Sequence, residues 1–191
     1  NRSARNLRET KTAHVPANRK AHGFISKYSN AENMVLGFHH MKPFCNAGGF
    51  LNHAVIEESA ATLMKKFDIR PPISDIPTSS LSGGNQQKLI VAREFHKDPR
   101  LLIIAQPTRG VDIGAIEFIH QQILDLRARK VAILLVSAEL EEIRSLSDRT
   151  LVMWEGKVAG EVSADQFDIQ EVGLLMTGQS FAQREQPDPI P

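Results

Sequence analysis

The segment Leu81-Ser82-Gly83-Gly84-Asn85-Gln86-Gln87-Lys88 is the most informative stretch of this sequence. A serine and two glycines stand at the start of a helix predicted over residues 83–97. Small residues at this place leave backbone N–H groups uncovered at the positive end of the helix dipole, where an anion such as phosphate can bind. A serine N-cap followed by a glycine turn is the simpler interpretation, and Ser-Gly-Gly by itself favours it. The surrounding sequence therefore decides between the two.

Two short apolar runs follow this segment along the chain. Residues 101–105 lie between Pro99 and Pro107, and residues 131–136 follow a helix predicted over residues 116–126. Continuous apolar runs of this length are typical of parallel strands that are buried on both faces. Strands that alternate with helices in this way predict an α/β fold with a mainly parallel sheet.

Periodicity and turn residues predict the rest of the architecture. The first thirteen residues are polar and basic, and a solvated helix or loose segment is expected there. The other predicted elements are an amphipathic helix over residues 53–68, short helices near residues 31–36 and 169–176, a helix capped by Ser137, and a hairpin of residues 150–154 and 157–162.

The composition is that of an ordinary globular domain, with 191 residues of which 41% are hydrophobic and 24% charged. A formal net charge of +1 argues against a dedicated nucleic-acid binder, whose basic excess would neutralise many phosphates. No apolar run approaches the roughly 20 residues of a transmembrane helix, and the basic first residues do not read as a secretory leader. The single cysteine, Cys45, excludes an internal disulfide and suits a reducing cytoplasm. His39 and His40 have no cysteine or carboxylate cluster beside them, so no metal site is predicted.

The order and spacing of several motifs resemble one family, the ATP-binding subunits of ABC transporters. The resemblance is to the sugar and nucleoside importer type, which carries two ATPase domains in one chain, and to the C-terminal of those domains. It runs from about His14 to Gly178. Its motifs are Val15-Pro16-Ala17-Asn18-Arg19, Asn33, the signature segment Leu81–Lys88, Pro107–Asp112 and Leu135–Leu140.

The resemblance implies a P-loop NTPase-like ABC ATPase fold, with a mainly parallel core sheet and a helical signature subdomain. We expect residues 1–191 to be a partial C-terminal ATPase domain. Its expected parts are a signature and helical part at about residues 14–100, a core sheet part at residues 101–178 and a tail at residues 179–191.

In this family ATP lies between two ATPase domains. The resemblance implies that Ser82, Gly83 and Gly84, with Asn85 beside them, contact the γ-phosphate that the opposite domain holds. It also makes Asp112 the aspartate of a loop that communicates between the two facing sites. For Arg109 two interpretations stay open, a brace for that loop and an ordinary exposed arginine.

The departures from the family pattern concern the site that this domain would build on its own strands. No Gly-x-x-x-x-Gly-Lys-Ser/Thr motif occurs, so the phosphate cradle of P-loop enzymes is not in these residues, and we expect the chain to begin inside a domain. The magnesium-binding aspartate and the catalytic glutamate are replaced by Ala105 and Gln106. Ala138 stands at the position of the switch histidine, and Ala17 where many members have a glutamine. A general base contributes about 10²- to 10⁴-fold to the rate, so this site is expected to hydrolyse ATP poorly.

Two functional hypotheses follow. In the first, the chain is part of an ATP-hydrolysing importer component that supplies its signature segment to a composite site, while its own site is degenerate. In the second, it is a non-catalytic regulatory and dimerisation module of the transporter. Both imply ATP and Mg²⁺ in the intact transporter, an N-terminal ATPase domain of the same chain, membrane permease subunits, an indirectly associated solute-binding protein and no nucleic acid. Both also imply a peripheral place at the cytoplasmic face of the membrane. The chain alone is expected to be inactive, and Gln106 before Pro107 resembles the nucleoside-importing branch.

Overall fold

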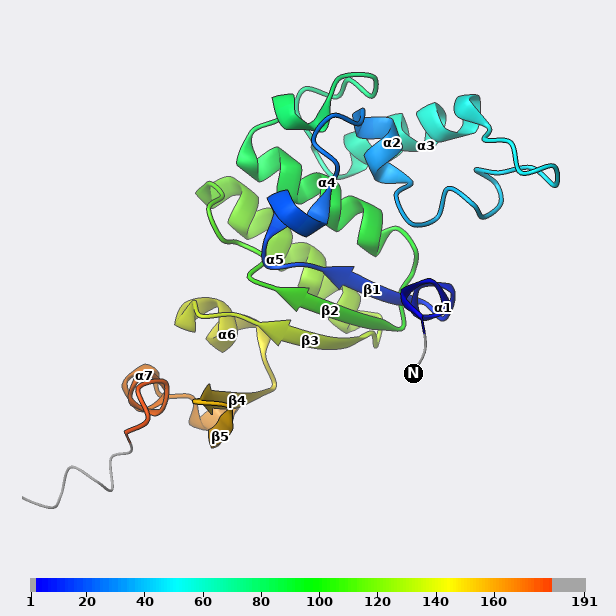
Figure 1. Cartoon of the computed structure of the whole chain (residues 1–191). Coiled ribbons are helices and arrows are strands. Elements are labelled where there is room, and N and C mark those ends of the chain that lie inside the picture. The colour runs from blue at the N-terminus through cyan, green and yellow to red at the C-terminus, as the bar shows by residue number, and fades with distance from the viewer. Residues whose placement is uncertain (1–2, 180–191) are drawn as a thin grey trace, which may run out of the picture. The chain divides into compact units, whose positions relative to one another are not determined.

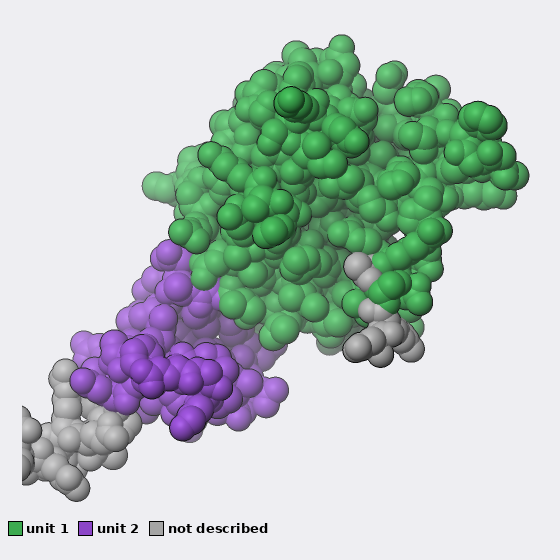
Figure 2. Space-filling view, viewed as in Figure 1, with its two compact units in different colours: residues 1–136 green, residues 137–191 purple. Residues whose placement is uncertain are grey.

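The computed structural model describes residues 3–179, which form two compact units that divide between Val136 and Ser137 (Figure 2). The first unit is built on a three-stranded parallel sheet in the order β1-β2-β3 (Figure 1). The strands are β1 (Thr12–Val15), β2 (Leu101–Ala105) and β3 (Ala132–Val136). The parallel sheet confirms the predicted α/β class, and β2 has the bounds that its flanking prolines predicted.

Helices cover one face of this sheet. The signature helix α4 (Gly83–Phe95) packs against β1 and against α5 (Ile113–Ala128), which connects β2 to β3. Leu102 and Ile104 on the covered face of β2 are completely buried, whereas Leu101 is 37% exposed. The alternation shows that the described residues bury only one face of β2.

The prediction that residues 101–105 and 131–136 form strands buried on both faces is therefore wrong. In β3, Leu134 is 54% and Val136 50% exposed. The strand lies at the edge of the three-stranded sheet, and an apolar run cannot tell which of its faces the rest of the chain covers.

The first unit also contains further helical elements. They are α1 (Ala4–Glu9), the π-helix η1 (Arg19–Gly23), α2 (Asn30–Met34), α3 (His53–Lys66) and the 3₁₀ turn η2 (Thr78–Ser80). α2 and α3 pack on each other and on α4. The buried Asn33 amide joins them to η2, since its Nδ2 donates to the Thr78 hydroxyl at 2.9 Å. Arg93 of α4 adds a second buried bond, from its Nη1 to the Asn33 carbonyl at 3.1 Å, so α2 is held to α4 by polar contact as well as by apolar packing.

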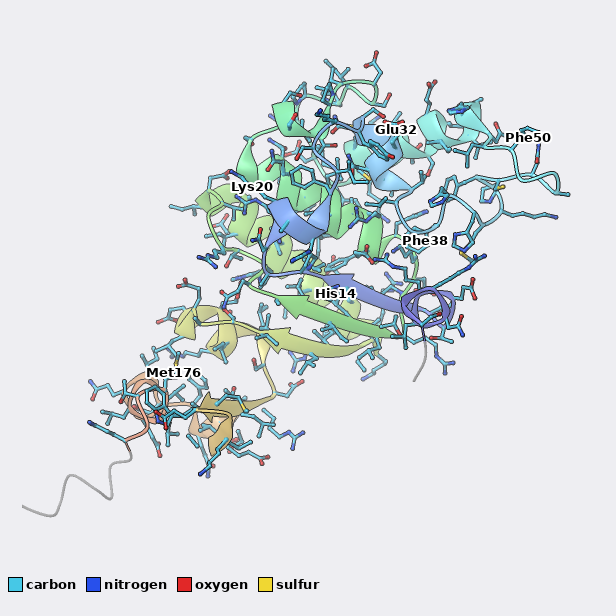
Figure 3. All side chains as sticks on the ribbon, in the orientation of Figure 1. His14, Lys20, Glu32, Phe38, Phe50 and Met176 are labelled. Atoms are coloured by element: carbon cyan, nitrogen blue, oxygen red, sulfur yellow. The ribbon has the colours of Figure 1, made fainter. Side chains whose placement is uncertain are left out.

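The second unit has a small core of its own. It contains α6 (Leu140–Leu146), β4 (Arg149–Trp154), β5 (Lys157–Ser163), the 3₁₀ turn η3 (Ala164–Gln166) and α7 (Ile169–Leu175). β4 and β5 form the predicted antiparallel hairpin. Val152 and Val162 of the hairpin pack with Val172 of α7, and Met176, labelled in Figure 3, borders this cluster.

One predicted cap in this unit is wrong. The N-cap position of α6 is Glu139, two residues after Ser137. Ser137 instead accepts a hydrogen bond from the Glu139 N–H at 3.0 Å, in the turn before the helix. Within residues 3–179, no helix combines the length and the apolar character needed to cross a membrane.

Candidate functional site

The N-terminus of α4 has the geometry of a serine-capped helix. Ser82 is the N-cap residue, and its Oγ accepts hydrogen bonds from the Asn85 backbone N–H at 3.4 Å and from Asn85 Nδ2 at 2.9 Å. The simpler interpretation, a serine N-cap, is therefore confirmed. The cap does not bury Ser82, which stays exposed. With two bonds accepted, its own proton is still available for donation to an anion.

The first N–H groups of α4 have no partner inside the helix. The first backbone bond of the helix runs from the Gln86 N–H to the Ser82 carbonyl at 2.8 Å, so the N–H groups of Gly83 and Gly84 precede it. Gly83 is partly exposed and Gly84 is buried. An approaching anion therefore meets the Ser82 hydroxyl and the Gly83 backbone at the positive end of the helix.

A loop over residues 106–112 leads from β2 into α5 beside this helix start. Gln106 begins it in the left-handed region with φ 49°, and its N–H donates to the Val136 carbonyl at 2.7 Å. Gly110 has φ 65°, a conformation that glycine adopts without steric cost. Asp112 ends the loop as the N-cap of α5, and its Oδ1 accepts the Ala115 N–H at 2.9 Å.

The two glycines of the signature segment face this loop. A Cβ atom built on Gly83 would lie 3.2 Å from the Gly110 carbonyl oxygen, and one built on Gly84 would lie 2.6 Å from Asp112 Oδ2. The structure thus brings the predicted residues Gly83, Gly84 and Asp112 together within the chain. A side chain at position 84 would have to displace the carboxylate of Asp112, whose Oδ1 caps α5.

Arg19, the last residue of the Val15–Arg19 motif, also contacts this loop, although the sequence analysis assigned it no role. Its Nη1 donates to the Arg109 carbonyl at 2.6 Å and its Nη2 to the Gly110 carbonyl at 3.1 Å. The side chain of Arg109, which was considered as a brace for the loop, is exposed. Position 109 takes part through its main chain, which any residue would supply.

Asn85 joins the helix start to a polar cavity of about 300 Å³. Its Oδ1 accepts the Arg70 backbone N–H at 2.8 Å. In the cavity wall, Asp68 pairs with Arg70 Nε at 2.8 Å and with Lys88 Nζ at 3.3 Å. Hydrogen bonds from Arg70 and then Lys88 hold the pKa of the Asp68 carboxyl below its ordinary value. Because Asp68 and Asp112 balance Arg70 and Lys88 in the cavity wall, the wall offers little net charge to an anion.

The three residues that the resemblance predicts at catalytic positions, Ala105, Gln106 and Ala138, carry no carboxylate. Ala105 and Gln106 follow one another at the end of β2, and Ala138 lies exposed in the turn after β3. A methyl group cannot bind Mg²⁺, and a glutamine amide can orient a water molecule but cannot take its proton. Residues 3–179 also contain no cluster of three His, Cys, Asp or Glu side chains able to hold a metal ion. The residues at the end of β2 therefore do not fit a magnesium site.

Comparison with curated proteins gives close relatives. The chain is 42% identical over 178 residues to the guanosine import ATP-binding protein NupO of Bacillus subtilis, and 43% identical over 178 residues to the nucleoside import ATP-binding protein NupA of Lactococcus lactis. It is 33% identical over 166 residues to the ribose import ATP-binding protein RbsA of Oceanobacillus iheyensis. The first two alignments cover 93% of this chain but 35% of each relative, so the chain spans about a third of their length. No family model matches the chain.

Solved structures agree in fold. A dimeric ATP-binding cassette in a post-hydrolysis state, bound to ADP and Pi, superposes with a TM-score of 0.68 at 20% identity, covering 84% of this chain and 66% of that one. A nucleotide-free cassette from an ABC transporter gives a TM-score of 0.66 at 19% identity, covering 85% of this chain and 65% of that one.

Proposed function

Because this chain belongs to the family of ABC ATP-binding proteins of nucleoside and sugar importers, we propose that it supplies the signature face of a composite ATP site in such an importer. The observation that carries the proposal is the start of α4. Ser82 presents an exposed hydroxyl there, and the N–H groups of Gly83 and Gly84 precede the first helical bond.

This face is suited to a phosphate group that another domain holds. The helix dipole favours negative charge at its N-terminus, and the Ser82 hydroxyl and the Gly83 N–H can both donate to a phosphate oxygen. Neither donor needs a lysine or a metal from this chain. Asp112 lies beside Gly84, so the same surface brings a carboxylate to the opposing domain.

The site built on this domain's own strands contributes little to hydrolysis in this proposal. Ala105 offers no carboxylate to Mg²⁺, and Gln106 cannot act as a general base. ATP with Mg²⁺ would be hydrolysed at the other composite site, where the residues of the opposing domain hold them. The proposal is therefore asymmetric, with one active site and one degenerate site.

The partners proposed for the chain follow from the same reasoning. They are an N-terminal ATPase domain of the same protein, permease subunits in the membrane, and a solute-binding protein that acts through the permease. The protein would work at the cytoplasmic face of the membrane as a peripheral component. Import of nucleosides is favoured over import of sugars, because the two most similar relatives named above are described as guanosine and nucleoside import proteins.

The test is steady-state ATP hydrolysis by the reconstituted importer. Ser82→Arg places a long side chain over the helix start, and turnover should fall by about 10²-fold or more because phosphate loses its donors. Ser79→Arg, at another exposed serine three residues earlier, is the matched control and should retain activity. Gln106→Glu should restore little, since Ala105 still gives Mg²⁺ no ligand.

Two results would overturn the proposal. If Ser82→Arg keeps the wild-type rate, the alternative of a regulatory and dimerisation module gains support. If Gln106→Glu alone raises turnover many-fold, the degenerate site is repairable by one residue and the asymmetric assignment is wrong.

A further inference from the structure

Arg19 holds the loop of residues 106–112 by a two-point contact. Its terminal nitrogens Nη1 and Nη2 donate to the consecutive carbonyls of Arg109 and Gly110, at 2.6 and 3.1 Å. A charged donor makes these bonds stronger than neutral ones, and the planar guanidinium fixes the direction of both carbonyls at once. The contact spans about 90 positions of sequence.

The short helix that carries Arg19 is itself fixed to α4. Asn18 caps η1, its Oδ1 accepting the Ala21 N–H at 3.1 Å, and at the other end the Gly23 carbonyl accepts from Arg93 Nη2 at 2.8 Å. A Cβ atom on Gly23 would lie 2.5 Å from Ile90 Cδ1, so η1 packs directly on α4. Figure 3 locates this helix by Lys20, the residue after Arg19. Arg19 is thus carried by a segment that does not move independently of the signature helix.

Gly83 lies against both members of the contact. A Cβ atom there would come within 2.8 Å of Arg19 Nη2 and 3.2 Å of the Gly110 carbonyl oxygen. The guanidinium, the loop and the first turn of α4 are therefore in close contact, and a side chain at position 83 would have to displace the guanidinium.

We propose that Arg19 is a positioning residue for the composite site, which sets the distance between the 106–112 loop and the N-terminus of α4. Through this contact Ser82 and Asp112 are presented as one surface to the opposing domain. The effect of Arg19 on ATP hydrolysis rests on the proposed function. The ordering of the loop by Arg19 does not depend on that function.

The first measurement is amide hydrogen exchange on the full-length protein. The N–H groups of Arg109 and Val111 bond inside the loop, to Gln106 and Thr108 at 3.3 and 3.4 Å, and so report on its order. Arg19→Met should make both exchange at least about tenfold faster, because both anchoring bonds are lost. Arg19→Lys keeps one charged donor, so its exchange rates should lie between those of the wild type and of Arg19→Met. Lys20→Met, on the same helix and exposed, is the control and should leave the loop unchanged.

The second measurement is ATP hydrolysis by the reconstituted importer with the same variants. Arg19→Met should lower kcat by about tenfold or more and leave KM for ATP within about twofold, since the donors that face phosphate remain but are misplaced. Arg19→Lys should recover part of kcat. A merely structural loss would also lower the apparent kcat at constant KM, because less protein is folded. The rate is therefore calculated per mole of folded importer, and only a kcat that stays low after this normalisation supports the positioning role.

The outcomes separate the two proposals. Unchanged exchange in the loop of Arg19→Met overturns the positioning role whatever the activity, and so does faster exchange with unchanged kcat. If Ser82→Arg leaves hydrolysis intact while Arg19→Met still speeds exchange, the composite-site function fails but the loop contact stands. If Arg19→Met does not fold, the graded exchange and kcat of Arg19→Lys decide.

Discussion

The buried carboxylate of Glu94, on the last turn of α4, offers the sharpest test of how the signature helix is held in place. Glu94 is completely buried and lies 2.7 Å from Lys97 Nζ, 2.9 Å from Arg93 Nε and 3.5 Å from Arg8 Nη1. The His14 N–H of β1 also donates to it at 3.3 Å. These cations hold the pKa of Glu94 below its ordinary value against the effect of burial. The carboxylate therefore ties α4 to α1 and β1.

Glu94→Gln keeps the size of the side chain and removes only its charge. Arg93, which is 3% exposed, would then be left without its counter-charge. Breaking a buried ion pair from one side typically costs about 3–5 kcal/mol. Burial already lowers the pKa of Lys97 to about 7, with Glu94 opposing the shift, so this lysine can give up its proton when Glu94 is neutral. We therefore expect a loss near the lower limit, about 3 kcal/mol, out of a total stability of roughly 5–15 kcal/mol.

Urea unfolding at pH 7.5, followed by far-UV circular dichroism, measures this loss. The single tryptophan, Trp154, lies in the second unit, so its fluorescence is not suited to report on α4. Glu117→Gln, at an exposed position of α5, is the control and should change stability by less than about 0.5 kcal/mol. A shift below about 1 kcal/mol for Glu94→Gln would refute the view that this carboxylate compensates buried cations.

Four further predictions follow from individual contacts. Because the pKa of Lys97 is lowered to about 7, the unfolded chain binds more protons above that pH; stability should rise between pH 7 and 9 in urea titrations, and Lys97→Met should flatten the rise. Gly84→Ala should cost about 1–3 kcal/mol in thermal unfolding because its Cβ would lie 2.6 Å from Asp112 Oδ2, whereas Gly114→Ala in α5, whose Cβ would make an ordinary contact at 3.6 Å with Asp112 Oδ1, should gain about 0.5–1 kcal/mol. Calorimetric titration of the 191-residue chain with Mg-ATP should show no micromolar binding, and measured micromolar affinity would contradict the degenerate site. Light scattering should detect self-association that rises with concentration, since Leu134 is 54% exposed on an edge strand, and a clean monomer throughout would speak against it.

The sequence predicted the elements whose signals are local. Proline on both sides marked residues 101–105, and β2 has those bounds. A helix predicted over residues 53–68 is α3 (His53–Lys66), because its apolar stripe ends before two prolines. The fold class, an ABC ATPase-like α/β domain, is confirmed by the solved cassettes. Prolines and apolar periodicity were sufficient to predict these two elements, and the order and spacing of the motifs were sufficient to predict the fold class.

The strand β1 could not be predicted in the same way. Its four residues, Thr12–Val15, contain no apolar run, and they become a strand only by pairing with residues 101–104. Such pairing depends on contacts nearly 90 residues away in sequence, which local propensity does not carry. The exposure of β3 has a similar origin, because burial of a strand depends on what the rest of the chain places over each face.

In the candidate site, too, local motifs predicted the residues but not the contacts that they make within the fold. These contacts decide which substitution is informative. Gly83 and Gly84 were assigned to phosphate contact from the resemblance, but a side chain at either position would first meet Arg19, Gly110 or Asp112 of the same chain. A loss of activity in a glycine variant therefore cannot separate phosphate approach from displacement of the loop. Ser82 is different, because its side chain is exposed and its helix-capping bonds can be measured separately by stability. A variant of Ser82 that retains the helix cap and blocks the approach of phosphate separates these two roles, and so does a variant that loses the cap and leaves the approach open. The composite-site proposal is therefore decided at Ser82.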